Sequence, residues 1–305
     1  MQRRHFISGA AAAFALASRV RIDAAALQFK YCICNEVFEK WDFAKSVRAM
    51  REAGFHGVEI APFTLADHVD DLTAERRRDL RDILKSEGIQ FAGLHWLLIT
   101  PKWLQIATAD RGIREKSWQY FHKLIDLCGD LGENGVMVLG SPNQRKSQGN
   151  SRDEAVRNVR DGLASVADHA RTRGVTIALE PLASAATDVV NTVAEAVRIV
   201  DEIKHPAIQS MFDFHNTLDE KEPFEKLVRD HYRAIRHIHV NEMDGRYPGT
   251  GNLDFRPVFQ VLADMKYRRW ISLEVFPPFK PGPVEIANAS MDFFRKLETT
   301  LKFPR

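Results

Sequence analysis

Two histidines stand two positions apart in the segment HIHVNE, residues 237–242. Side chains at positions i and i+2 of a β-strand point to the same face, so His237, His239 and Asn241 are expected to line up. Neutral imidazole is the commonest metal ligand among side chains, and interior histidines also serve as hydrogen-bonded packing groups. The segment alone leaves two interpretations open: a pair of packed interior histidines, or a metal ligand at a strand end.

Three further apolar runs end in a carboxylate: Glu180 in ALEPL, Asp213 in MFDFHN and Glu274 in SLEVF. Three carboxylates gathered in a protein interior would repel one another strongly unless a cation neutralised them. Three oxygen ligands and one imidazole nitrogen suit a divalent ion such as manganese, magnesium, cobalt or zinc. We therefore predict one divalent metal ion with four ligands: Glu180, Asp213, His239 and Glu274. His237, one layer deeper, is then expected to be a packed, hydrogen-bonded neighbour.

The elements that would bring these residues together alternate along the chain from residue 27 onward. Short runs rich in Val, Ile and Phe predict strands, and the longer charged segments between them have the period of helices. Strands are expected over 28–34, 55–60, 90–96, 135–140, 175–180, 207–213, 235–241 and 270–275. Helices are expected over 42–53, 73–87, 111–131, 151–173, 191–204, 222–232, 255–266 and 284–301.

Eight strands that alternate with eight helices predict an α/β fold, a single (β/α)₈ TIM barrel over residues 27–305. A doubly wound open sheet is the alternative, but the first strand lacks the glycine-rich phosphate loop of a Rossmann unit. Thr73 and Ser151 are predicted helix N-caps, the latter in a capping box with Glu154, and Gly174 is a predicted C-cap. Since barrel sites are built at the carboxyl ends of strands, the four predicted ligands would share one rim.

The motifs LEPL, FDFHN, HIHVNE with PGTGNLDF, and SLEVF occur in this order and spacing, and the matching region covers residues 28–300. Together they resemble the xylose-isomerase-like barrel family of sugar and sugar-phosphate isomerases and epimerases. By motif they are most similar to the ketose 3-epimerases of the D-tagatose and D-psicose type. The resemblance implies that the four predicted ligands hold one divalent metal ion. It also implies that Glu180 and Glu274 exchange a proton with a substrate carbon on opposite faces.

The chemistry of such an enzyme requires this arrangement. A metal that binds the carbonyl and hydroxyl oxygens of a ketose acidifies the adjacent C–H bond, because it stabilises the enediolate that forms. Removal and return of the proton then require an acid/base group on each face. The expected function is therefore a divalent-metal-dependent isomerase or epimerase of a ketose or keto-sugar derivative, with Glu180 and Glu274 as the catalytic pair.

The sequence departs from the 3-epimerase pattern at positions that hold substrate in that family. Ala186 stands where a second glutamate follows Glu180 by six residues, and Gly245 stands where an arginine follows His239 by six. Asn216 occupies the place of a family histidine. The four predicted metal ligands thus match the family pattern, while the residues at the substrate-binding positions differ from it. The sugar, its phosphorylation and its glycosidic state are left open.

Five residues are predicted to bind substrate: His95, Arg145, His215, Asn216 and Arg246. His95 follows the third strand, where either a core histidine or a substrate contact is consistent with the sequence. Arg145 follows the fourth strand, where it either caps the next helix, faces solvent, or uses its guanidinium to recognise carboxylate, phosphate or vicinal hydroxyls.

The first 26 residues predict an export signal. Arg3 and Arg4 precede an apolar run from Phe6 to Ala17, which is too short to span a bilayer as a mature anchor. The paired arginines resemble a twin-arginine signal, which directs folded bacterial proteins across the inner membrane. A periplasmic location without a stable membrane anchor is therefore expected, with cleavage after either Ala17 or Ala26.

Composition narrows the partner classes. Lys and Arg total 43 against 41 Asp and Glu, and the first 26 residues, with four arginines against one aspartate, account for more than this excess. A near-neutral body favours a small carbohydrate partner and argues against nucleic acid. The three cysteines form no even disulfide set and are expected to be buried free thiols. A homo-oligomer is compatible with the sequence.

Two other functions remain open at this level. A hydrolase could use the same metal to activate water, and a lyase could use it to eliminate a group from a keto-glycoside. The departures from the family pattern at the substrate-binding positions are compatible with either reaction. A non-catalytic sugar-binding barrel would leave the paired glutamates without a role.

Overall fold

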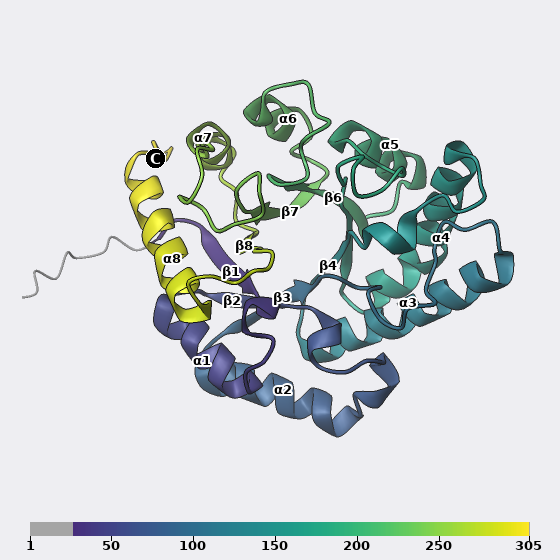
Figure 1. Cartoon of the computed structure of the whole chain (residues 1–305), viewed down its shortest axis with the longest axis horizontal. Helices are drawn as coiled ribbons and strands as arrows, with labels where there is room; N and C mark the ends of the chain where they lie inside the picture. The colour runs from purple at the N-terminus through teal and green to yellow at the C-terminus, as the bar shows by residue number, and fades with distance from the viewer. Residues whose placement is uncertain (1–26, 305) are drawn as a thin grey trace, which may run out of the picture.

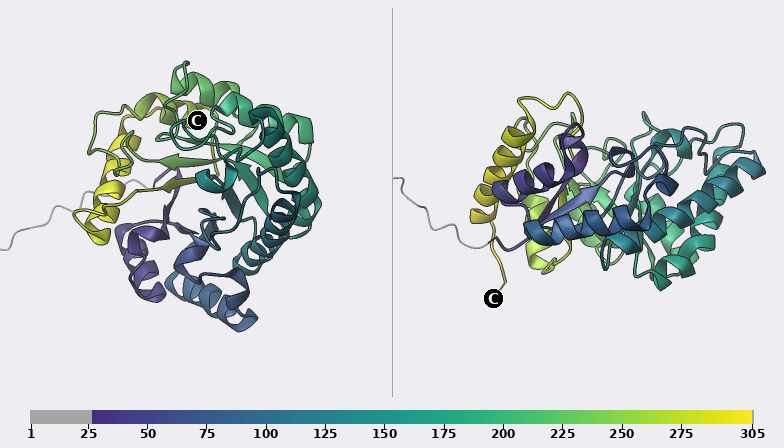
Figure 2. Two further views of the ribbon diagram at one scale, coloured as in Figure 1. Left: turned by 45° about the vertical axis from the view of Figure 1, so that its right-hand side comes forward. Right: turned by 90° about the horizontal axis from the view of Figure 1, so that it is seen from below.

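Within residues 27–304, eight parallel strands close into a barrel and eight α-helices surround it (Figures 1 and 2). The computed structural model describes residues 27–304, and the predicted export signal lies outside them. The strand order is consecutive from β1 to β8, so the predicted (β/α)₈ barrel is confirmed. In residues 27–304, none of the helices combines the length and the apolar character that a membrane crossing requires.

Every predicted strand and helix is present. The strands are β1 (Lys30–Cys34), β2 (Gly57–Ile60), β3 (Gln90–Leu94), β4 (Val136–Leu139), β5 (Thr176–Leu179), β6 (Ile208–Asp213), β7 (Ile235–Val240) and β8 (Trp270–Leu273). The helices are α1 (Phe43–Ala53), α2 (Ala74–Glu87), α3 (Arg111–Leu131), α4 (Arg152–Thr172), α5 (Val193–Ile203), α6 (Phe224–Asp230), α7 (Arg256–Asp264) and α8 (Pro283–Thr299). The strands are one or two residues shorter than predicted. β1, β2 and β6 begin later, β3, β7 and β8 end earlier, and β4 and β5 lose one residue at each end.

The predicted helix ends are confirmed by their hydrogen bonds. Ser151 and Glu154 form a capping box, in which each side chain accepts the backbone N–H of the other. The Thr73 hydroxyl accepts the N–H of Arg76 at the start of α2. Gly174, just beyond α4, has a φ of 68°, the left-handed conformation that closes many helices. These local signals mark the start of α2 and both ends of α4.

The strand register aligns the residues at the carboxyl rim. Asp213 on β6 lies opposite His239 on β7, and His239 lies opposite Ser272 on β8. Glu180 and Glu274 directly follow β5 and β8, and their N–H groups still bond to carbonyls of the neighbouring strands. Because all eight strands run parallel, their carboxyl ends meet at one end of the barrel.

Helix α8 packs against the outer side of β1, in the ring of helices around the barrel (Figure 1). The Tyr31 ring on β1 stacks on Phe294, with centroids 4.3 Å apart. The Tyr31 hydroxyl donates to Oε1 of Glu298 at 2.9 Å, and this carboxylate also accepts the N–H of Phe29 and of Gln28. Glu298 therefore joins the first strand to the last helix, a role in stability far from the carboxyl rim.

The cysteines match their prediction. Cys32, Cys34 and Cys128 are free and buried. Burial raises the pKa of each thiol, so all three are expected to remain protonated at neutral pH.

Candidate metal centre

The four predicted metal ligands converge at the carboxyl rim. Each offers one ligand atom, these atoms all lie within 4.8 Å of one another, and all four side chains are buried. Their elements are adjacent in the barrel, since Glu180 follows β5, Asp213 ends β6, His239 lies in β7 and Glu274 follows β8. Four neighbouring strands thus place three carboxylates around one imidazole.

The imidazole of His239 has two distinct sides. Its Nδ1 lies 3.1 Å from Oε2 of Glu274, 3.7 Å from Oδ2 of Asp213 and 4.0 Å from Oε1 of Glu180. Its Nε2 lies on the other side, 3.1 Å from Oε2 of Glu59. Nδ1 is therefore the nitrogen that faces the carboxylates.

The surroundings shift the pKa values of Glu180 and Glu274 in opposite directions. Burial and the charges of Asp213 and Glu274 raise the pKa of Glu180 well above its ordinary value. Burial would also raise the pKa of Glu274, but the His239 charge and the hydrogen bonds from His239 and His95 outweigh it and hold that pKa well below its ordinary range. Such opposed environments are typical of an acid and a base that work as a pair.

The donor set fits a divalent cation. Three carboxylates and one imidazole nitrogen are hard and intermediate ligands, and the three carboxylates more than balance the charge of a divalent ion. Asn216 supports two of them, because its Nδ2 donates to Oε1 of Glu180 at 3.2 Å and to Oδ2 of Asp213 at 3.0 Å. The cluster could hold a metal, and a bound cation would lower the pKa of Glu180.

A cavity of about 130 Å³ opens beside the cluster. Its polar lining consists of His95, Ser141, Glu180, His215, Asn216 and Glu274. Its apolar lining includes Trp96, Val138, Leu182 and Phe276. A mainly apolar wall with a few convergent polar groups is typical of small-molecule sites, and carbohydrates offer both C–H faces and hydroxyls to such a wall.

Two loops after β3 and β4 shape the mouth of this cavity. Trp96 and Ser141 both have a φ of 50°, a left-handed conformation that non-glycine residues seldom adopt. The Ser141 hydroxyl accepts the N–H of Leu98 at 3.2 Å and so ties the loops together. The Trp96 ring stands edge-on to Phe276, with centroids 6.2 Å apart. Backbone conformations of this kind cluster at ligand sites.

The structure separates the five predicted substrate residues into two groups. His95, His215 and Asn216 line the cavity. Arg145 is fully buried, and its Nη1 donates to the carbonyls of Leu139 and Glu180 at 3.1 and 2.7 Å. Arg246 lies on the exposed loop after β7, where it pairs with Asp244 at 2.8 Å. Neither arginine is among the residues that line the cavity, although Arg145 supports the backbone that carries Glu180.

Two buried acids were not predicted as part of the site. Glu36, just after β1, places Oε2 at 2.9 Å from Nε2 of His95. Burial would lower the pKa of His95, but Glu36 and Glu274 raise it to about 10. Glu59 on β2 lies within hydrogen-bond distance of both His237 and His239. The sequence pattern that predicted the other acids also applies to these two, since each lies within or just after an apolar run.

The chain also matches a known protein family. A family model described as a xylose isomerase-like TIM barrel matches residues 47–297. The chain belongs to this family. The family resemblance predicted from the motifs is therefore confirmed, while the activity of this member is not fixed by membership alone.

Proteins similar to this chain include several named as sugar epimerases. The chain is 24% identical over 234 residues to a ketose 3-epimerase of Arthrobacter globiformis, which covers 76% of each protein. It is 22% identical over 248 residues to a 3-dehydro-D-guloside 4-epimerase of Escherichia coli, covering 79% of this chain and 89% of the relative. The solved D-psicose 3-epimerase of Clostridium cellulolyticum superposes with a TM-score of 0.77 at 18% identity, covering 88% of this chain and 99% of that one.

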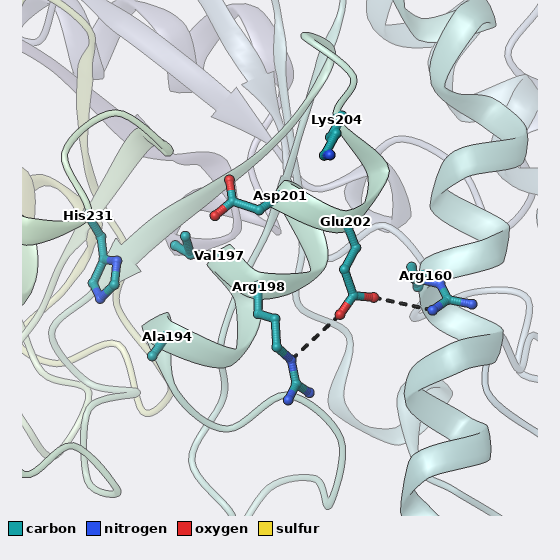
Figure 3. A pocket seen from close by; sticks show the side chains of 8 residues that line it. All are labelled: Arg160, Ala194, Val197, Arg198, Asp201, Glu202, Lys204 and His231. Carbon is teal, nitrogen blue, oxygen red and sulfur yellow. Dashed lines mark hydrogen bonds and ion pairs between the residues drawn. The ribbon is translucent and has the colours of Figure 1, made fainter.

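A larger surface groove lies elsewhere on this family member. It has a volume of about 840 Å³ and is lined by residues of α4, α5 and the end of α6, as Figure 3 shows. Its charged groups pair with each other, since Glu202 lies 3.2 Å from Arg160 and 3.9 Å from Arg198. The groove is on the outer wall, away from the strand ends where sites of this fold are built. We therefore place the site in the smaller cavity.

Gly140 provides a structural test of the metal centre. A Cβ atom at this position would overlap Oε2 of Glu180. Overpacking a filled site typically costs about 1–3 kcal/mol, so Gly140→Ala is expected to lower metal affinity by roughly tenfold or more. Titration with zinc against a chromophoric chelator measures the change. Gly112→Ala is the control, because a Cβ there makes only an ordinary contact, 3.4 Å from Asp110. Equal affinity in the two variants would contradict the placement of Glu180.

Proposed function

We propose that this protein is a metal-dependent sugar isomerase or epimerase that acts on a ketose or keto-sugar derivative. One observation carries the proposal: Glu180 and Glu274 border the same cavity, and each also belongs to the four-residue cluster that could hold a metal. The two carboxylates come from β5 and β8, on either side of Asp213 and His239. The family relatives named as ketose and keto-sugar epimerases support this reading.

In the proposed reaction the glutamates move a proton. Glu274, which the hydrogen bond with Nδ1 of His95 helps to keep ionised, takes the proton from the carbon next to the substrate carbonyl. Glu180, which also borders the cavity, returns a proton to the other face of that carbon, which inverts it. A divalent ion in the cluster would hold the substrate oxygens and stabilise the negative charge of the enediolate.

The remaining lining residues would orient the sugar. Nδ1 of His95 already lies 3.4 Å from Oε1 of Glu274, so this imidazole is placed to donate to a substrate oxygen beside the base. Asn216 holds Glu180 in position through its amide. The Trp96 and Phe276 rings would cover the apolar face of the sugar and exclude water.

A screen of substrates tests the proposal. The metal-loaded protein is incubated with free ketoses, keto-glycosides and sugar phosphates, and the products are followed by NMR. We expect an epimer or isomer of at least one keto-sugar to accumulate, and the same protein after chelation to be inactive. Conversion of no sugar in any class, or conversion that survives complete metal removal, would contradict the proposal.

A second candidate is a metal-dependent hydrolase or lyase that acts on a keto-glycoside. The observation in its favour is the cavity wall at Leu182 and Ala186, which is apolar and small where the 3-epimerase pattern places a glutamate. Such a wall would accommodate an aglycone in place of a hydroxyl contact. The same screen separates the two, because a hydrolase or lyase releases the aglycone, whereas an epimerase keeps it attached.

We propose in addition that the protein is exported to the periplasm by a twin-arginine route. Arg3, Arg4 and the short apolar run that follows support this location. Replacing both arginines with lysine is expected to retain the protein in the cytoplasm, as measured by immunoblotting of cell fractions. An unchanged periplasmic amount in this variant would contradict the twin-arginine route.

A further inference from the structure

Glu59 contacts the predicted ligand His239 from outside the four-residue cluster, and it is not among the residues that line the cavity. It is on β2, and its side chain is fully buried. A single oxygen, Oε2, lies 2.8 Å from Nε2 of His237 and 3.1 Å from Nε2 of His239. Its other oxygen, Oε1, has no hydrogen-bond partner among residues 27–304. A carboxylate in such a place costs much free energy unless the two imidazoles stabilise it.

We propose that Glu59 is the positioning residue of the metal centre and that it acts through His239. A neutral imidazole carries its proton on only one nitrogen, and the partner of that N–H selects which one. When Nε2 of His239 donates to Glu59, Nδ1 keeps its lone pair and points at Glu180, Asp213 and Glu274. Glu59 thereby fixes both the tautomer and the ring orientation that a metal ligand needs. This inference rests on the metal site of the proposed function.

His237 completes the arrangement from the layer below. Its ring lies 5.1 Å from the His239 ring, and its Nε2 shares the same Glu59 oxygen. His237 is therefore expected to hold the carboxylate in place, and Glu59 in turn holds His239. This explains the pair of histidines in HIHVNE: one is placed to bind a metal, and the other supports the acid that orients it.

The same region suggests a competing arrangement. Cys32, Glu59 and His237 bring three ligand atoms within 4.8 Å of one another, and Nδ1 of His237 has no hydrogen-bond partner among the described residues. A second metal ion at this place would engage Glu59 directly and would add one equivalent of bound metal. The positioning role instead predicts a single equivalent, because Glu59 then serves only as a hydrogen-bond acceptor.

Glu59→Gln separates these arrangements. Glutamine keeps an oxygen that accepts hydrogen bonds but removes the negative charge that favours the Nε2–H form. We expect one zinc equivalent in both proteins, with a dissociation constant raised roughly 10–100-fold in the variant, the usual effect of losing an outer partner. Cobalt in the variant should also show altered visible absorption bands. Glu298→Gln, which removes a buried carboxylate at the far end of the barrel, is the control and should keep both zinc affinity and the cobalt spectrum.

A measurement on the unmodified protein covers the case in which Glu59→Gln does not fold. Histidine labelled with ¹⁵N is observed by NMR in the zinc-loaded protein, and the His239 signals are assigned as those absent from His239→Gln. The positioning role predicts a proton on Nε2 of His239 and zinc on Nδ1. A proton on Nδ1 would overturn it.

The remaining outcomes also have defined meanings. Unchanged zinc affinity and an unchanged cobalt spectrum in Glu59→Gln would overturn the positioning role while leaving the proposed metal site intact. Two zinc equivalents in the unmodified protein, one of them lost in Glu59→Gln, would overturn it in favour of the second metal site. No zinc binding by the unmodified protein would overturn the proposed metal site, and this inference with it.

Discussion

His239→Ala is expected to abolish stable metal binding. The substitution removes the single imidazole of the four-residue cluster and leaves three buried carboxylates without the group that lies among them. The loss of affinity should exceed the roughly 10–100-fold drop expected when only an outer partner is removed. Elemental analysis after dialysis measures the occupancy. His231→Ala, on the outer groove of Figure 3, is the matched control and should keep full occupancy. Full occupancy in the His239 variant would exclude the predicted site.

Glu180→Gln and Glu274→Gln are expected to lower turnover far more than metal affinity. Glutamine still offers a carbonyl oxygen to a hard cation, but it cannot accept or return a proton. A positioned acid or base typically contributes a factor of about 10²–10⁴ to the rate, and each variant should lose that much. Steady-state kinetics at saturating metal, with zinc titration in parallel, measures both effects.

The control for these two variants is Glu242→Gln. Glu242 is a buried carboxylate on the loop after β7, where it accepts the backbone N–H groups of Gly249 and Leu253. Its substitution should affect stability and leave turnover of the folded protein nearly unchanged. Near-normal turnover in either Glu180→Gln or Glu274→Gln would remove that residue from the proposed acid/base pair.

The barrel was predictable from the sequence because each element carries its own local signal. The apolar strand runs and the caps at Thr73, Ser151 and Gly174 depend on neighbouring residues only, and the structure confirms them. The four metal-ligand candidates were predictable for a related reason. In a parallel barrel the carboxyl ends of all strands meet, so an acid or histidine at a strand end has a known position.

The surrounding residues were harder to predict, because the loop backbone decides where their side chains point. Arg145 turns inward and donates to the backbone carbonyl of Glu180, and Arg246 turns outward to Asp244. The sequence shows both as loop arginines with the same potential to bind a ligand. Glu36 and Glu59 precede the strands on which the motifs lie, and their contacts with His95 and His239 span long stretches of chain. Only the closed barrel brings these partners together.

The most direct test of the central claim is turnover in heavy water. The metal-loaded protein is given a sugar that it converts, and the recovered substrate and product are examined by NMR for deuterium bound to carbon. If Glu180 and Glu274 transfer a proton at the carbon next to the carbonyl, deuterium should appear at that carbon, and the exchange should be lost in both glutamine variants. Full turnover with no deuterium on carbon in either sugar would contradict the account and favour hydrolysis at the same site.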